Sequence, residues 1–226
     1  MPMFRSIDRY PLVSQSNADS PLTEMYRALR TKLRIIGNGQ PAQVLVVTSA
    51  TAGEGKSLTT ANLAITFALE GKKTLIVDAD MRKPALHQAF LRANRVGLAS
   101  VLDESCTVSE AIRTTDIDRL QLVTAGNPLL NPAELIGSGR MLKVVEELRG
   151  MYDVILIDCP PLLTTSEAQL LSLLADGVLL VVRSGKVKRR AVERAKSMLE
   201  QSGARLFGAV LNHVGKHPGD VRYYGT

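Results

Sequence analysis

Short runs of apolar, largely β-branched residues recur along this chain, separated by segments with helical patterning. The segments that contain these runs are residues 43–49, 73–80, 119–126, 152–161, 177–182 and 204–212. A strand without polar alternation is buried on both faces, and a parallel sheet with helices packed on each side provides that burial. The pattern therefore predicts an α/β fold with a doubly wound, mostly parallel sheet.

The intervening segments predict helices at residues 20–36, 56–71, 84–90, 131–150, 166–175 and 188–203. Ser20 and Pro21 open the first helix, as a side-chain cap followed by proline at the first helical position. The residues expected on its buried face are Tyr26, Leu29, Leu33 and Ile36. A length of 226 residues fits a single domain. We place it at residues 20–212, between an irregular segment at 1–19 and a flexible tail at 213–226.

Composition favours a soluble protein of the cytoplasm. The N-terminal residues carry charge and proline where a secretory signal needs an apolar core. The longest apolar region, residues 170–182, is interrupted by Asp176 and Gly177 and is too short to span a bilayer. Cys106 and Cys159 have neither metal-ligand spacing nor a disulfide-dense context. We therefore expect a reducing compartment.

A glycine-rich loop joins the first apolar run to the next helix and ends in Gly55, Lys56 and Ser57. Backbone N–H groups of such a loop surround the oxygens of a triphosphate, the lysine neutralises β/γ charge and the hydroxyl binds Mg²⁺. A plain glycine turn is the alternative, and Ala50 replaces the glycine of the common pattern. The loop predicts a P-loop NTPase-like domain. The expected nucleotide-binding residues are Ala52, Gly53, Glu54, Gly55, Lys56, Ser57 and Leu58.

Carboxylates end two further apolar runs. Asp78 and Asp80 follow one run with a single residue between them, and Asp158 ends another before two prolines. The carboxyl ends of parallel strands meet at the ligand crevice of the sheet, where the glycine-rich loop also opens. Phosphoryl transfer needs charge neutralisation and one group that orients the nucleophile. We expect two of these carboxylates to hold Mg²⁺, partly through water, and one to serve the nucleophile.

With these motifs in order, the sequence resembles the bacterial tyrosine kinases (BY-kinases), cytoplasmic autokinases associated with capsule and exopolysaccharide synthesis. The segments "SATAGEGKS", "LIVDADMR" and "VILIDCPP" resemble the Walker A, Walker A′ and Walker B motifs of that family. The resemblance spans the chain from about Ser20 to Thr226 and implies ATP and Mg²⁺. The residues to which it gives catalytic roles are Lys56, Asp78, Asp80 and Arg82.

The resemblance also assigns individual roles. It implies that Asp78 activates a tyrosine hydroxyl and that Arg82 lies beside the reacting phosphate. It implies metal ligation by Ser57, Asp80 and Asp158, and it gives an adenine contact to Asn212 at the end of the last apolar run.

The first helix, residues 20–37, contains Glu24, Arg27 and Arg30, which match the oligomerisation motif of the family. From the residues alone, these side chains predict an (i, i+3) ion pair on a polar helix edge. From the resemblance, they imply a ring-like homo-oligomer.

Tyr223 and Tyr224 lie side by side near the end of the chain, and the resemblance makes them phosphate acceptors. Fourteen residues follow Asn212, enough to span roughly 45 to 50 Å when extended. A compact domain of this size has a radius of gyration of about 17 Å, so the tail can reach its own site or a neighbour's. Family members usually carry a longer tyrosine cluster.

The resemblance further implies a separate membrane protein whose cytoplasmic tail activates the kinase and recruits it to the inner face of the membrane. It also implies a cognate tyrosine phosphatase, with no direct nucleic-acid contact. The main alternative is a partition or positioning ATPase of the Par/Min type, a nucleotide switch on DNA or membrane, which the basic helix around Lys188 to Lys196 would suit. Such proteins carry a signature lysine where this chain has Thr51. A nucleotide-binding adaptor without catalysis is a third possibility.

Overall fold

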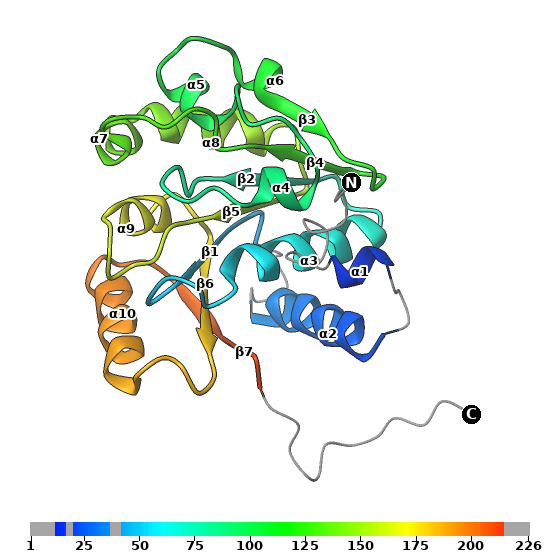
Figure 1. The fold of residues 1–226 in the computed structure, drawn as a ribbon, viewed down its shortest axis with the longest axis vertical. Helices are drawn as coiled ribbons and strands as arrows, with labels where there is room; N and C mark the ends of the chain where they lie inside the picture. The colour runs from blue at the N-terminus through cyan, green and yellow to red at the C-terminus, as the bar shows by residue number, and fades with distance from the viewer. Residues whose placement is uncertain (1–11, 17–19, 37–41, 215–226) are drawn as a thin grey trace, which may run out of the picture.

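The computed structural model describes residues 12–16, 20–36 and 42–214 (Figure 1). Within these residues, seven strands form one sheet in the order β3-β4-β2-β5-β1-β6-β7. The strands are β1 Val44–Ser49, β2 Thr74–Asp78, β3 Ile112–Thr114, β4 Leu120–Val123, β5 Val154–Asp158, β6 Gly177–Arg183 and β7 Leu206–Asn212. Neighbouring strands pair in parallel, except that β3 runs antiparallel to β4. The predicted mostly parallel α/β sheet is confirmed.

Helices cover both faces of this sheet. They are α1 Val13–Ser16, α2 Pro21–Ile36, α3 Lys56–Leu69, α4 Leu86–Ala89, α5 Leu98–Leu102, α6 Val108–Ala111, α7 Pro132–Gly137, α8 Arg140–Arg149, α9 Glu167–Ser172 and α10 Arg189–Gln201. The predicted start of α2 is confirmed, since the backbone N–H of Thr23 donates to Ser20 Oγ at 3.1 Å. Across the described ranges, none of the helices combines the length and apolar character needed to cross a membrane.

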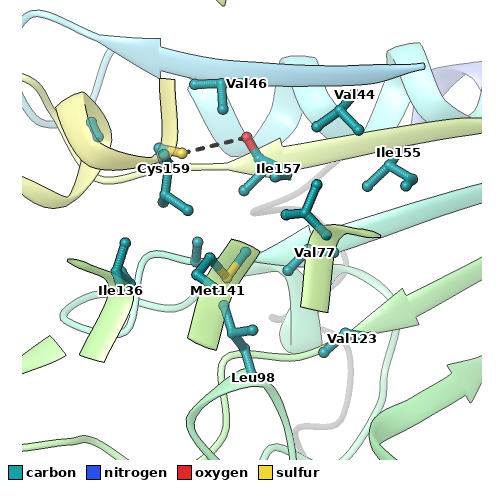
Figure 2. Packing of buried hydrophobic residues seen from close by; sticks show 14 of the residues in the cluster. Val44, Val46, Val77, Leu98, Val123, Ile136, Met141, Ile155, Ile157 and Cys159 are labelled. Carbon is teal, nitrogen blue, oxygen red and sulfur yellow. Dashed lines mark hydrogen bonds between the residues drawn. The ribbon is translucent and has the colours of Figure 1, made fainter. Parts of the chain in front are cut away.

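Successive residues of β1 point into opposite cores. Val44 and Val46 belong to a cluster completed by residues of α5, α7, α8, α9 and α10. Leu45 and Val47 belong to a second cluster that α2 and α3 cover. Figure 2 shows the first cluster, in which Met141 of α8 lies among valine and isoleucine side chains of the strands. Every residue of β1 is buried, as expected of a strand covered on both faces.

The sheet register brings the polar strand ends together. β5 lies between β1 and β2, and Asp158 at its end is the register partner of both Val47 and Asp78. The three strands therefore end at one edge of the sheet, and the loops that follow them open on the same side.

Some local features differ from the prediction. The helix expected at 131–150 is two helices, because Gly139 adopts a left-handed φ of 78° between α7 and α8. The antiparallel strand β3 and the short helices α5 and α6 were not predicted, since elements this short carry no readable period. Helix α1 lies in the segment 1–19 that was expected to be irregular. Ile36, expected on the buried face of α2, is 40% exposed.

Candidate active site

The loop between β1 and α3 has the backbone that its glycines predict. Gly53 and Gly55 have φ values of 78° and 94°, a region that favours glycine. A Cβ placed on Gly55 would lie 2.0 Å from Asn212 Nδ2, so a side chain there would displace the Asn212 amide from the loop. Ala50 is not among the residues with positive φ, so the loop meets its alanine at this position without strain.

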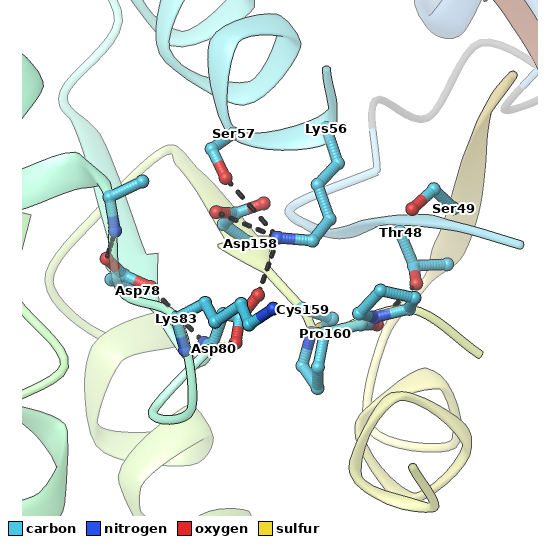
Figure 3. Close-up of polar contacts among 12 residues, drawn as sticks. Thr48, Ser49, Lys56, Ser57, Asp78, Asp80, Lys83, Asp158, Cys159 and Pro160 are labelled. Atoms are coloured by element: carbon cyan, nitrogen blue, oxygen red, sulfur yellow. Dashed lines mark hydrogen bonds and ion pairs between the residues drawn. The ribbon is translucent and has the colours of Figure 1, made fainter. Parts of the chain in front are cut away.

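Lys56 lies at the centre of a cluster of charges at this edge of the sheet (Figure 3). Its Nζ is 2.7 Å from Asp80 Oδ2 and 3.9 Å from Asp158 Oδ2, and it donates to Ser57 Oγ at 3.4 Å. Burial of this group lowers the pKa of Lys56, but the neighbouring carboxylates outweigh burial and raise it overall. Lys56 is therefore a buried cation held between carboxylates.

Asp78 is fully buried beneath the turn that follows β2. Its Oδ1 accepts from the backbone N–H of Asp80 at 3.2 Å, and its Oδ2 accepts from Ala85 and Leu86 at 3.2 and 3.1 Å. Burial, together with the charge of Asp158, raises the pKa of Asp78 to about 8. Asp78 thus organises this turn and has no contact with solvent in the structure.

Asp158 is the carboxylate whose surroundings fit a metal ion best. It is fully buried, its Oδ1 is 3.5 Å from Thr60 Oγ1, and its Oδ2 has no hydrogen-bond partner in the structure. Burial raises the pKa of Asp158, while Lys56 opposes the shift. Lys56 Nζ lies 3.9 Å from Oδ2, which is too far for a hydrogen bond, whereas buried carboxylate oxygens normally have a partner at hydrogen-bond distance.

The donor set also fits the coordination chemistry of Mg²⁺. Hydroxyl and carboxylate oxygens of Ser57, Asp80 and Asp158 surround Lys56, and such hard oxygens are the ligands that Mg²⁺ prefers. Among the described residues, no group of three or more His, Cys, Asp or Glu side chains could hold a metal. Mg²⁺ at nucleotide sites typically takes one or two carboxylates and completes its shell with phosphate and water.

Glu54 fixes the conformation of the glycine-rich loop from inside. Its fully buried carboxylate accepts from the backbone N–H of Thr51, from Thr51 Oγ1 at 3.0 Å and from the backbone N–H of Arg183 at 3.2 Å. Its carbonyl accepts from Asn212 Nδ2 at 3.0 Å. The predicted adenine contact, Asn212, therefore lies directly against the loop. Glu54, predicted to bind nucleotide, turns its side chain away from solvent and can offer only its backbone.

Two basic residues near the loop were not predicted. Arg183, at the end of β6, donates from Nη1 to the Gly53 carbonyl at 3.3 Å. Lys186 Nζ lies 3.2 Å from where a Cβ on Gly53 would be. Both belong to the basic stretch at residues 183–196. Nothing in the local sequence indicates that this segment folds against the loop.

Arg82 contacts a carboxylate that the sequence did not single out. Its Nε and Nη2 lie 3.0 and 2.9 Å from Glu167 Oε1. Glu167 is the first residue of α9. An acidic residue at the start of a helix is already explained by its favourable interaction with the helix dipole. Glu167 therefore did not stand out in the sequence as a site residue.

The proposed oligomerisation residues have unequal environments. Glu24 and Arg27 form the predicted (i, i+3) ion pair on the surface of α2. Arg30 is turned inward: its side chain is 16% exposed, Nη1 donates to the Thr66 carbonyl and Nε lies 3.5 Å from Glu70 Oε2. Arg30 therefore fastens α2 to α3 within the chain.

The end of β7 places the last described residues near the site. β7 pairs in parallel with β6, and the side chain of its final residue, Asn212, bonds the glycine-rich loop. Tyr223 and Tyr224 lie outside the described residues. The chain thus leaves the sheet at the edge that carries Lys56.

Residues 42–202 match the family described as "AAA domain". The tyrosine-protein kinase YwqD of Bacillus subtilis is 38% identical over 217 residues, which cover 95% of this chain and 91% of that protein. The kinase domain of the Escherichia coli tyrosine kinase ETK superposes with a TM-score of 0.89 at 29% identity, covering 100% of this chain and 93% of that one. The chimerical protein CapA2B2 superposes with a TM-score of 0.87 at 38% identity, covering 91% and 90%.

Proposed function

The chain belongs to the bacterial tyrosine-protein kinases, and from that premise we propose that it transfers the γ-phosphoryl group of ATP to tyrosines of its own C-terminal segment or of a neighbouring subunit. The observation that carries the proposal is the buried Lys56 between Asp80 and Asp158, at the mouth of a glycine-rich loop. Thr51, at the position of the signature lysine, argues against a Par/Min-type switch.

Charge neutralisation comes first in the proposed reaction. The β- and γ-phosphates bind to backbone N–H groups of residues 52–58, and Lys56 meets their oxygens in competition with Asp80. Ser57, Asp80 and Asp158 are the residues that would hold Mg²⁺, and the ion would neutralise phosphate charge. Asp158 Oδ2, which lacks a hydrogen-bond partner, is the oxygen best placed for this role.

Asp78 and Arg82 serve the transfer itself. Asp78 is the proposed acceptor of the tyrosine proton, because Lys56 pairs with the other two carboxylates. Because Asp78 is buried, its surroundings must open before a hydroxyl reaches it. Arg82 supplies positive charge beside the γ-phosphoryl group as negative charge redistributes in transfer.

The proposed acceptors are Tyr223 and Tyr224, and the domain limits remain as predicted, with the kinase domain at 20–212. The exit of β7 on the Lys56 edge supports this choice. We further propose a ring-like homo-oligomer in which Glu24 and Arg27 form contacts between subunits, with Arg30 supporting α2 from within. Such an assembly raises the local concentration of a neighbour's tail.

The proposed setting is the inner face of the cell membrane. The name of the chimerical neighbour CapA2B2 supports a partner, and we propose a separate membrane protein whose cytoplasmic tail activates the kinase and recruits it from the cytoplasm. A tyrosine phosphatase resets the tail. The cycle regulates capsule or exopolysaccharide synthesis and export.

The test measures phosphotyrosine after incubation with Mg·ATP, with and without a tail peptide from the membrane partner. Wild type is compared with Lys56→Met, and ATP binding to both is measured separately. We expect phosphotyrosine in wild type and none in Lys56→Met. A wild-type protein that binds ATP but forms no phosphotyrosine, even with the peptide, would refute the proposal.

A further inference from the structure

Glu167 is a buried carboxylate with an incomplete set of partners. Its residue is 2% exposed, and Oε1 takes both contacts from Arg82. Oε2 is buried and has no hydrogen-bond partner in the structure. Buried carboxylates are normally satisfied at both oxygens, so this arrangement calls for a physical reason.

Arg82 joins this buried group to solvent. Its side chain is 55% exposed although its partner is buried. The guanidinium is planar, and its Nε and Nη2 face Glu167, so its Nη1 side faces away from that carboxylate. Arg82 can therefore bind a second anion with Nη1 while it keeps its counter-ion.

The turn that carries Arg82 is tied to the catalytic cluster. Arg82 follows Asp80 by two residues, Asp80 Oδ2 meets Lys56 Nζ at 2.7 Å, and Asp80 Oδ1 accepts from the backbone N–H of Lys83 at 3.0 Å. Glu167 begins α9, the helix after β5, and β5 ends in Asp158. The Arg82 to Glu167 pair thus joins the segments that follow the two acid-bearing strands β2 and β5.

We propose that Glu167 is a positioning residue that aims Arg82 at the transferred phosphoryl group, an inference that rests on the proposed kinase function. On this proposal, Glu167 Oε2 has no partner because it is a second oxygen with which Arg82 can pair. As Arg82 swings toward a bound phosphate, its guanidinium can pass from one carboxylate oxygen to the other and remain paired. A fixed structural pair would gain from satisfying both oxygens at once.

The test is a double-mutant cycle at these two residues. Glu167→Gln keeps the shape of the side chain and removes its charge; Arg82→Ala removes the guanidinium. We expect Glu167→Gln to slow single-turnover transfer at saturating ATP by about 10- to 100-fold, as a misplaced catalytic group does. Its Kd for ATP stays within about threefold of wild type, since the lysine and loop contacts are intact. In the Arg82→Ala background, Glu167→Gln causes no further loss.

Asp176→Asn is the matched control, because Asp176 also pairs with an arginine, Arg149 at 2.7 Å, but at the start of β6, away from the site. It is expected to lower the melting temperature and leave the transfer rate of folded protein unchanged. Glu167→Asp replaces Glu167→Gln in the cycle if the glutamine variant is recovered unfolded.

An unchanged rate in Glu167→Gln, or losses that multiply in the double variant, would overturn the positioning role. If wild type forms no phosphotyrosine, the kinase proposal fails and the cycle is read on the rate of ATP hydrolysis. Hydrolysis transfers the same phosphoryl group to water. A hydrolysis rate about 10- to 100-fold lower in Glu167→Gln than in wild type therefore supports the positioning role, and equal rates in the two proteins refute it.

Discussion

Two demands meet at Gly55, one from its backbone conformation and one from a neighbouring side chain. Its φ is 94°, and the amide of Asn212 occupies the space that a side chain would need. The sequence predicted the first demand from the loop pattern. It could not predict the second, because residues 55 and 212 meet only through the order of strands in the sheet.

Gly55→Ala is therefore expected to weaken ATP binding by more than backbone strain explains. The new Cβ, 2.0 Å from Asn212 Nδ2, displaces Asn212 and breaks its bond to the Glu54 carbonyl. Gly71→Ala is the control, with a φ of 90° and no atom within 4 Å of the new Cβ. It should cost about 1 kcal/mol of stability and leave the Kd for ATP unchanged. Equal Kd values for the two variants, measured by titration calorimetry, would contradict the role of Asn212.

Single residues with local signals could be singled out from the sequence, and those with distant partners could not. Lys56, Ser57, Asp78 and Asp158 follow from motif and strand position, and the structure brings them together. Glu167 had no such signal, because its partner is far away in the sequence. The same limit explains why the positions of Arg183 and Lys186 beside the glycine-rich loop were not predicted.

At the scale of elements, α2 depends on α3 for its position. Arg30 bonds the Thr66 carbonyl and lies near Glu70, and Arg34 also reaches Glu70 Oε1 at 2.6 Å. The amphipathic pattern predicted that α2 is a helix and which face is buried, apart from its last residue. It did not show that an arginine of the polar edge packs inward.

Arg30→Ala is expected to lower the free energy of unfolding by about 1 to 3 kcal/mol, because Glu70 loses a partner and the buried Thr66 carbonyl keeps only the backbone N–H of Glu70 as a donor. Arg27→Ala removes only an exposed pair and should change stability by less than about 1 kcal/mol. Urea denaturation measures both. If the two variants were equally stable, Arg30 would be a surface residue after all.

The start of β1 depends on Asp176. Its Oδ2 accepts from the backbone N–H groups of Gln43 and Val44 at 2.8 and 2.7 Å, and Arg149 pairs with both of its oxygens. Partial burial raises the pKa of Asp176, but the hydrogen bonds from Arg149 and the backbone outweigh burial and lower it overall.

This lowered pKa makes part of the stability dependent on pH. A carboxyl whose pKa is lower in the folded state stabilises the protein above its unfolded pKa, about 3.9 for Asp, and loses that effect as pH falls through the folded value. Wild type should therefore be more stable than Asp176→Asn at pH 7, and the difference should shrink below about pH 4. Thermal unfolding at several pH values measures it. A difference that stays constant down to pH 2 would contradict this account.

At the scale of the whole molecule, the apolar runs were sufficient to predict the doubly wound sheet. Burial on both faces of β1, β2 and β5 left few other arrangements. The strand order and the antiparallel β3 were beyond prediction, since pairing between distant segments leaves no local pattern. The parallel pairing of β7 bears most on the proposed function, because it places Asn212, the last residue of the strand, against the glycine-rich loop.

Mapping of phosphorylated residues by mass spectrometry tests the central claim most directly. Lys56→Met protein, which supplies only acceptor tyrosines, is mixed with a Tyr223→Phe/Tyr224→Phe chain, which supplies only an active site. The partner tail peptide and Mg·ATP are added, and wild type is mapped in parallel. We predict phosphate on Tyr223 or Tyr224 in wild type and, through assembly, on the Lys56→Met chain of the mixture. Wild-type protein that binds ATP yet carries no phosphate at either tyrosine would contradict the account.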